Sequence, residues 1–390
     1  MSGRKVCEVA ALDFDFEWQS AEGVHTPELR ASCCRLTIRV NGEPITHVED
    51  SAAKSVRDGI YVPLYPVAEW IATNWFPLLD EPEAPWRRRF RRRHSFVHAG
   101  EGFALPDLSI FSAGEIMRVE WRARNPQYSN VMFPRSGTAE VERAQVQVAL
   151  SGLVEAVIQR LRDVGLTITT ALEEEWQSLW LLDAEERAFC RTAGELGLDP
   201  FYLEEGVAER IISVNEALPE SLRDDFFAVS TITALADDKE WVLDVLQKVK
   251  RCAPTDTDLP RLRRLARERL AELESHEPWR IGKHLARDMR AELGLDGAPV
   301  PCELLREKLG FETVVTVEQS RAFDAVVDMD HATGQGRFAL AGRREDSKRF
   351  DYGRALFEYL SAPEACFPRL ASRARTYRQK ESRAFATEFL

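Results

Sequence analysis

Three charged side chains near the end of the chain have the spacing to build an ion-pair site. Arg354 and Glu358 lie four residues apart, and Glu381 follows further along. On a helix, residues i and i+4 share a face, so Arg354 and Glu358 can pair with each other. An exposed pair of this kind contributes only about 0.3–0.5 kcal/mol to stability. A guanidinium group can also bridge two carboxylates through bidentate hydrogen bonds.

A strand and a helix are expected to position these residues. Residues 337–341 are short, apolar and bounded by glycines, which is typical of a buried strand. Residues 347–361 have an apolar helical face made by Phe350, Gly353, Leu356, Phe357 and Leu360. Ser347 suits the N-cap of this helix, and Pro363 stands just past its end.

In this order, the segments resemble the ImmA/IrrE family of zinc metallo-endopeptidases. That family has a strand, then a helix of the form R-F-x-x-A-H-E-x-x-H-x-L, and later a helix of the form E-A-N-x-F-A. Residues 349–360 and 381–386 match these helices in part, and residues 281–295 and 299–311 resemble segments upstream of them. The resemblance covers about residues 276–390 and implies a zincin-like α+β domain.

The family's zinc ligands are replaced in this chain. Arg354 stands at the first His position, Ala355 at the Glu position and Glu358 at the second His position, whereas Glu381 matches the later Glu ligand. Zinc needs nitrogen or oxygen donors at about 2.0–2.2 Å, and the Glu beside the first His serves as general base for the metal-bound water. An arginine is not deprotonated in proteins and cannot bind a cation. The resemblance therefore implies a pseudoenzyme, with Arg354 in the place of the zinc and between the carboxylates of Glu358 and Glu381.

The resemblance also implies a context for the protein. It indicates a cytoplasmic protein of a bacterium or mobile element, related to peptidases that cut transcriptional repressors or act in the stress response. Our leading prediction is a non-catalytic sensor or regulator without a cofactor, which contacts a protein partner such as a transcriptional regulator. The alternative is an active zinc-dependent endopeptidase with Asp351, Glu358 and Glu381 as ligands. The family's domain continues beyond the position of Leu390, so the domain is either naturally short or truncated.

Composition is that of a soluble globular protein. The 390 residues are 44% hydrophobic and 30% charged, enough for two or three domains with their own cores. No run of 18 apolar residues predicts a membrane helix, and the first residues lack the apolar core of a signal peptide. Seven cysteines without C-x-x-C spacing argue against a disulfide framework and favour the cytoplasm. The net charge of −12 disfavours general affinity for nucleic acids.

One segment of this acidic protein is strongly basic. Residues 87–93 contain six arginines around Phe90, which could grip phosphates while the ring stacks on a base. The candidate nucleic-acid or anion-binding residues are Arg87, Arg88, Arg89, Arg91, Arg92 and Arg93. The favoured interpretation is a strand whose arginines pair with acidic neighbours such as those at 80–83. A nucleic-acid-associated regulator is therefore the second alternative function.

The predicted fold class is α+β, with a strand-rich domain over residues 1–135, a helical domain over 136–275 and the peptidase-like domain over 276–390. In the first domain we predict a helix at 65–79 and a tight hairpin turn at Asn41-Gly42. Its predicted strands cover residues 12–18, 34–40, 94–98, 108–111 and 116–121. On such a strand His94 and His98 would stand about 13 Å apart, too far to share a metal.

The helical domain carries one clear start signal. Asp183 followed by Glu186 predicts an N-cap with a capping box. Helices are predicted at residues 140–164, 172–180, 188–194, 201–214, 241–249 and 262–273. The segment 188–214 has the outline of a helix-turn-helix DNA reader. Three glutamates in its second helix would repel phosphates, so we interpret it as a packing unit.

Overall fold

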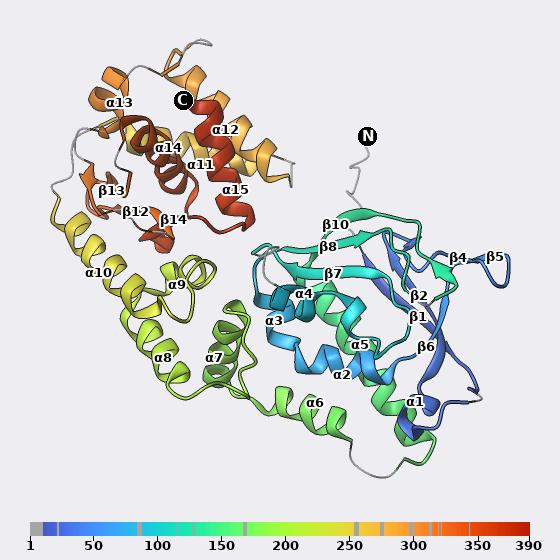
Figure 1. Cartoon of the computed structure of the whole chain (residues 1–390). Helices are drawn as coiled ribbons and strands as arrows, with labels where there is room; N and C mark the ends of the chain where they lie inside the picture. Colours follow the sequence, from blue (N-terminus) through green and yellow to red (C-terminus); the bar gives the residue numbers. More distant parts are fainter. Residues whose placement is uncertain are drawn as a thin grey trace, which may run out of the picture. The chain divides into compact units, whose positions relative to one another are not determined.

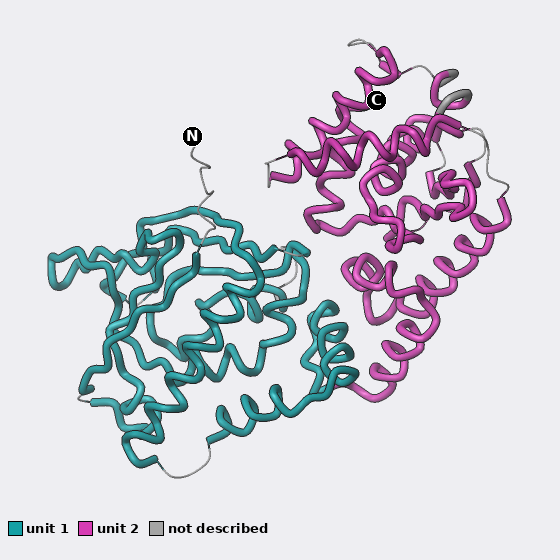
Figure 2. The backbone as a smooth tube through the Cα atoms, turned by 180° about the vertical axis from the view of Figure 1, so that it is seen from behind, with its two compact units in different colours: residues 1–202 teal, residues 203–390 magenta. Residues whose placement is uncertain are grey.

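The structure is a computed structural model that describes residues 11–390 except 22, 84–87, 115, 128, 167–169, 253–256, 274–276, 296–298, 301, 312–313, 319, 321 and 343. The chain has the predicted α+β class and divides into two compact units, residues 1–202 and 203–390 (Figure 2). Among the described helices, none combines the length and the apolar character that crossing a membrane requires.

The first unit begins with an antiparallel sheet. Strand β1 (Leu12–Trp18) pairs with β2 (Cys33–Val40), and β3 (Glu43–Pro44) and β6 (Ile60–Pro63) pair with β2 as well (Figure 1). Asn41 and Gly42 join β2 to β3 with φ angles of 54° and 76°. Two consecutive positive φ angles match the right-handed twist of the paired strands, which is why Asn-Gly suits this turn. The predicted hairpin is confirmed.

A second antiparallel sheet has the order β10-β8-β7. Its strands are β7 (Asp107–Ser112), β8 (Ile116–Arg122) and β10 (Gly137–Glu142). Along β8, the buried Met117, Val119 and Trp121 alternate with more exposed residues, as expected of a strand with one covered face. A small third sheet, in the order β5-β4-β9, contains β4 (Val48–Asp50), β5 (Ser55–Arg57) and β9 (Val131–Met132).

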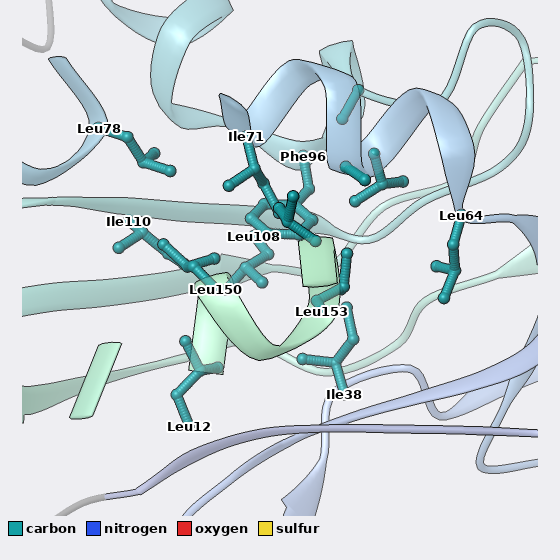
Figure 3. Packing of buried hydrophobic residues seen from close by; sticks show 14 of the residues in the cluster. Leu12, Ile38, Leu64, Ile71, Leu78, Phe96, Leu108, Ile110, Leu150 and Leu153 are labelled. Carbon is teal, nitrogen blue, oxygen red and sulfur yellow. The ribbon is translucent and has the colours of Figure 1, made fainter. Parts of the chain in front are cut away.

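The helices of the first unit share one core with its strands. They are α1 (Pro27–Ala31), α2 (Tyr65–Thr73), α3 (Trp75–Asp80), α4 (Arg88–His94), α5 (Arg143–Asp163), α6 (Ala171–Leu181) and α7 (Ala184–Glu195). Figure 3 shows Leu150 and Leu153 of α5 among residues from β1, β2, α2 and β7. The predicted boundary after residue 135 therefore lies inside a unit, because the apolar face of α5 is part of the same core as the strands.

Three local predictions for the first unit meet different outcomes. The capping box at Asp183 is confirmed, since both of its hydrogen bonds are present. The helix predicted over 65–79 is divided at Asn74 into α2 and α3. The strand predicted at 94–98 is wrong: these residues form the end of α4 and the short 3-10 helix η1 (Phe96–His98). The arginines in α4 are good helix formers, which the prediction of a strand did not take into account.

The second unit contains a mixed sheet in the order β11-β13-β12-β14. Strands β12 (Phe323–Met329) and β13 (Gly336–Leu340) form an antiparallel hairpin, with Met329 opposite Gly336, and β13 confirms the strand predicted at 337–341. Strand β11 (Val315–Thr316) is parallel to β13, and β14 (Arg369–Ser372) is antiparallel to β12. The register of β12 against β14 shifts between Phe323 and Ala325, so Asp324 lies at a bulge.

Eight helices surround this sheet within the described part of the second unit. They are α8 (Val207–Ala217), α9 (Glu220–Phe227), α10 (Leu235–Arg251), α11 (Leu259–Glu272), α12 (Pro278–Glu292), α13 (Cys302–Leu309), α14 (Glu345–Ser361) and α15 (Tyr377–Phe389). Helix α14 packs on β12, β13 and β14, while α9 contacts β14 and α10 contacts β12 and β13 (Figure 1).

Some predicted bounds in this unit shift. Helix α8 starts at Val207, after a left-handed Gly206, rather than at residue 201. Helix α14 starts at Glu345 with Arg344 as N-cap, so Ser347 lies inside the helix instead of capping it. Apolar residues of α11 share a core with α12 and α14, so the predicted boundary at residue 275 also lies inside a unit.

Candidate functional site

Helix α14 is buried along most of its length. Every residue from Tyr352 to Leu360 is buried, including the two charged residues Arg354 and Glu358. Arg354 is 2% exposed and Glu358 is fully covered. A charged side chain in such a position must be compensated by ion pairs and hydrogen bonds, because desolvation of an unpaired charge costs several kcal/mol. The interpretation of these two residues as an exposed surface pair is therefore wrong.

The guanidinium group of Arg354 is held by four residues from three elements. It forms an ion pair with Asp324 of β12. Its Nη2 donates to the backbone oxygen of Ser372 in β14 at 2.5 Å and to Oε1 of Gln379 in α15 at 2.6 Å. Its Nε donates to Oγ of Ser382 at 3.3 Å. Arg354 thus joins its own helix α14 to strands β12 and β14 and to helix α15.

Glu358 has a different cationic partner. Its carboxylate is paired with Arg378 of α15, and Nε of Arg369 lies 3.8 Å away. Arg378 in turn is paired with Asp225 of α9. Burial raises the pKa of Glu358, although Arg369 and Arg354 lower it in part. The expected pairing of Arg354 with Glu358 along the helix is replaced, among the described residues, by these two separate ion pairs.

Gln379 connects the two ion pairs. Its Oε1 accepts from Arg354 and, at 2.9 Å, from the backbone N–H of Ser372. Its Nε2 donates to the backbone oxygen of Leu370 at 2.9 Å and lies 3.4 Å from Glu358. The side chain is fully buried. A neutral amide that donates at one end and accepts at the other can satisfy an arginine and a carboxylate at once.

Asp351 and Glu381 lie at the margin of this network. Asp351 is half-buried one turn before Arg354, and burial together with the nearby Asp324 raises its pKa to about 6. Glu381 is half-buried on α15, and its charge contributes to the raised pKa of Glu358. The expected bridge, in which Arg354 would join Glu358 to Glu381, is not the observed one, because the carboxylate paired with Arg354 is that of Asp324.

The donor set does not fit the family's zinc. Arg354 offers only N–H donors, and the carboxylate of Glu358 is engaged by Arg378. Ala355 is buried and has no group that could act as a base. Across the part of the chain that the structure describes, no three His, Cys, Asp or Glu residues are grouped to hold a metal ion.

Sequence reasoning missed most members of the network. Among them are Asp225, Asp324, Arg378 and Gln379. Asp324 carried a usable signal, because it interrupts the apolar run from Ala322 to Val327, and an acidic residue in a buried strand needs a partner. The other three had none, since their role depends on α9 and α15 meeting α14 in space.

The arginine run belongs to α4 rather than to a strand. Arg87 and the side chain of Arg88 lie outside the described residues. Arg91 is paired with Asp107 at 2.9 Å and Arg93 with Glu81 at 2.6 Å, while Arg89 and Arg92 are exposed.

Phe90 is not free to stack on a base. It is 4% exposed and stacks on His94, with 4.0 Å between the ring centroids. His94 is buried, with Nδ1 at 2.6 Å from the backbone oxygen of Ile110 and Nε2 at 3.0 Å from Glu81. His98 is exposed in η1, so the two histidines have different surroundings.

Comparison of the chain with protein-family models, with curated proteins and with solved structures gave no match in any of the three.

Proposed function

We propose that this chain is a peptidase-like regulatory protein that acts by contact with a protein partner and does not cleave it. The second unit has the order of elements that led to the resemblance with the ImmA/IrrE family: a strand hairpin, the helix α14 and the later helix α15. The observation that carries the proposal is the buried Arg354. Its guanidinium group occupies the motif's first ligand position and bonds to Asp324, Ser372, Gln379 and Ser382.

A permanently charged guanidinium at this position is incompatible with a divalent cation beside it. At an effective dielectric constant of about 20, a unit charge and a divalent cation about 4 Å apart repel by about 8 kcal/mol. The carboxylate of Glu358, at the second ligand position, is engaged in an ion pair with Arg378 and is therefore not available to bind a metal ion. A scaffold that can neither hold the metal nor supply the base retains only its surface for function.

The proposal is tested first on the unmodified protein. The amount of zinc bound per chain is measured by mass spectrometry after equilibration with zinc, and casein is incubated with the protein with and without a chelator. We expect no stoichiometric zinc and no chelator-sensitive fragments. Stoichiometric zinc that is lost in Glu358→Gln or Glu381→Gln would contradict the proposal and favour the alternative of an active endopeptidase.

The ancestry of the scaffold is tested by restoring the motif. The triple variant Arg354→His, Ala355→Glu and Glu358→His supplies both histidines and the general base at the spacing that zinc peptidases use. We expect it to take up zinc, and to lose that zinc when Glu381→Gln is added. The double variant Arg354→His, Glu358→His is the matched control, since it supplies zinc donors without the base. Circular dichroism verifies that each variant is folded.

A further inference from the structure

A pocket in the first unit has the dimensions of a small-molecule site. It lies between α3, α5, α6 and α7 and has a volume of about 530 Å³. Pockets that bind small organic ligands usually have about 300–1,000 Å³ and combine apolar walls with a few polar groups. This pocket is separate from the network around Arg354, which belongs to the second unit.

Aromatic and aliphatic side chains form one wall. Trp75 and Phe76 of α3 line the pocket with Leu179 and Trp180 of α6. Trp180 is 52% exposed, whereas Trp176, whose ring contacts it edge to face, is buried. On α5, the lining residue Val148 is 71% exposed. An indole ring and an isopropyl group that remain exposed at a concave surface are typical of a ligand site.

The side chains that line the pocket carry more positive than negative charge. Among the described residues that line the pocket, Arg143, Arg187 and Arg191 are basic and Asp80 alone is acidic. Asp80 is buried, with its Oδ1 2.5 Å from Nη1 of Arg143 and 3.5 Å from Nε of Arg191. One carboxylate therefore holds two guanidinium groups in place and leaves an excess of two positive charges.

The arginines retain donors for a ligand. The side chain of Arg191 is 58% exposed and contacts Asp80 through Nε, so its two terminal nitrogens can reach solvent. Arg187 is exposed and donates to the backbone oxygen of Leu182 at 3.2 Å. Guanidinium groups prefer to bind planar oxyanions with two parallel hydrogen bonds.

We propose that this pocket binds a small aromatic carboxylate. The carboxylate would be bound by Arg191 and Arg187, and the aromatic body would lie against Trp180 and Leu179. The excess positive charge disfavours a cationic ligand, and the apolar wall disfavours a fully hydrated anion such as inorganic phosphate. The pocket's size suits a ligand with one or two rings.

The test uses 1-naphthoate as the probe and the full-length protein. Binding is measured by isothermal titration calorimetry at low ionic strength. We expect saturable binding that weakens by about tenfold or more in Arg191→Gln, since a charge-assisted hydrogen bond contributes at least that factor. Val148→Asp, which places a negative charge at an exposed position of the wall, should weaken it as well. Arg122→Gln, in an exposed arginine of β8, is the matched control and should leave the affinity unchanged.

Three results would overturn the proposal. The first is the absence of saturable binding up to the solubility limit of 1-naphthoate. The second is that the uncharged 1-naphthalenemethanol binds with the same affinity as 1-naphthoate. The third is that the wild type, Arg191→Gln and Val148→Asp bind 1-naphthoate with equal affinity. Either of the last two results would show a merely hydrophobic surface. Both substituted positions are exposed, so folded variants are expected, and near-ultraviolet circular dichroism checks this.

Discussion

Arg354 of α14 and Asp324 of β12 form an ion pair inside the second unit, with side chains that are 3% and 14% exposed. The pair connects α14 to β12, an inner strand of the sheet. Because the same guanidinium group also binds β14 and α15, it ties together strands and helices that are distant in the chain. The side chains around Arg354 form a buried ion-pair network.

Loss of the cation should destabilise the second unit strongly. In Arg354→Met the carboxylate of Asp324 loses its buried partner and keeps its ion pair with Arg373, whose side chain is 54% exposed. Removal of one member of a buried pair typically costs about 3–5 kcal/mol. Urea unfolding, with hydrogen exchange of α14 and α15 as the local readout, measures the effect. The exposed Arg344→Met is the control, and a loss below about 1 kcal/mol would show that the pair is not structural.

A close approach of two helices should make Gly282 intolerant of a side chain. A Cβ atom at Gly282 would lie 2.3 Å from the backbone oxygen of Glu381 and 2.8 Å from the backbone nitrogen of Phe385. Backbone cannot move aside as a flexible side chain can, so Gly282→Ala should push α12 from α15 and destabilise the unit by about 1–3 kcal/mol. Gly152→Ala, at a helical position with open space, is the matched control and should be neutral or stabilising. Equal unfolding midpoints for both variants would contradict the predicted contact.

The stability of the second unit should depend on pH through Asp351. Burial and Asp324 raise the pKa of Asp351 from 3.8 to about 6, so the folded state holds this proton more tightly than the unfolded state. The favourable contribution of the protonated Asp351 to the free energy of unfolding is therefore present below about pH 4 and is lost as the pH rises through about 6. The side chain of Asn in Asp351→Asn cannot ionise. As the pH rises from about 5 to about 7.5, the free energy of unfolding of this variant should therefore increase by about 1–2 kcal/mol relative to that of the wild type, allowing for partial solvent screening.

Urea unfolding at both pH values measures the Asp351 effect. The exposed Asp346→Asn, in the first turn of the same helix, is the control and should show no such difference between the two conditions. If the free energies of unfolding of Asp351→Asn and the wild type change equally between the two pH values, the pKa of Asp351 is not raised in the folded state.

A buried carboxylate should be essential to the first unit. Glu81 is 3% exposed and accepts from Nε and Nη2 of Arg93 at 2.7 and 2.6 Å, with Nε2 of His94 at 3.0 Å. Burial raises its pKa, but the bonds to His94 and Arg93 outweigh this and hold the pKa below its usual value. Glu81→Gln should lower the free energy of unfolding by about 3–5 kcal/mol, measured by thermal or urea unfolding. Glu43→Gln, in an exposed pair, should cost less than about 1 kcal/mol.

Local patterns predicted many elements of this fold. The alternation in β1, the Asn-Gly turn after β2 and the capping box of α7 each depend on neighbouring residues, and each is confirmed. The prediction failed at residues 94–98, where the chain continues from a helix rich in arginine. Five residues are too few for their hydrophobic pattern to distinguish a strand from a helix.

The amino-acid sequence by itself determined the α+β class and the helix that carries Arg354 and Glu358. Only the tertiary structure decided what that arginine does. The i and i+4 spacing favours a pair between Arg354 and Glu358, but burial gives each a partner from another element, Asp324 and Arg378. The physical reason is that a buried charge needs several hydrogen bonds in fixed directions, and only strands and helices distant in the chain supply them.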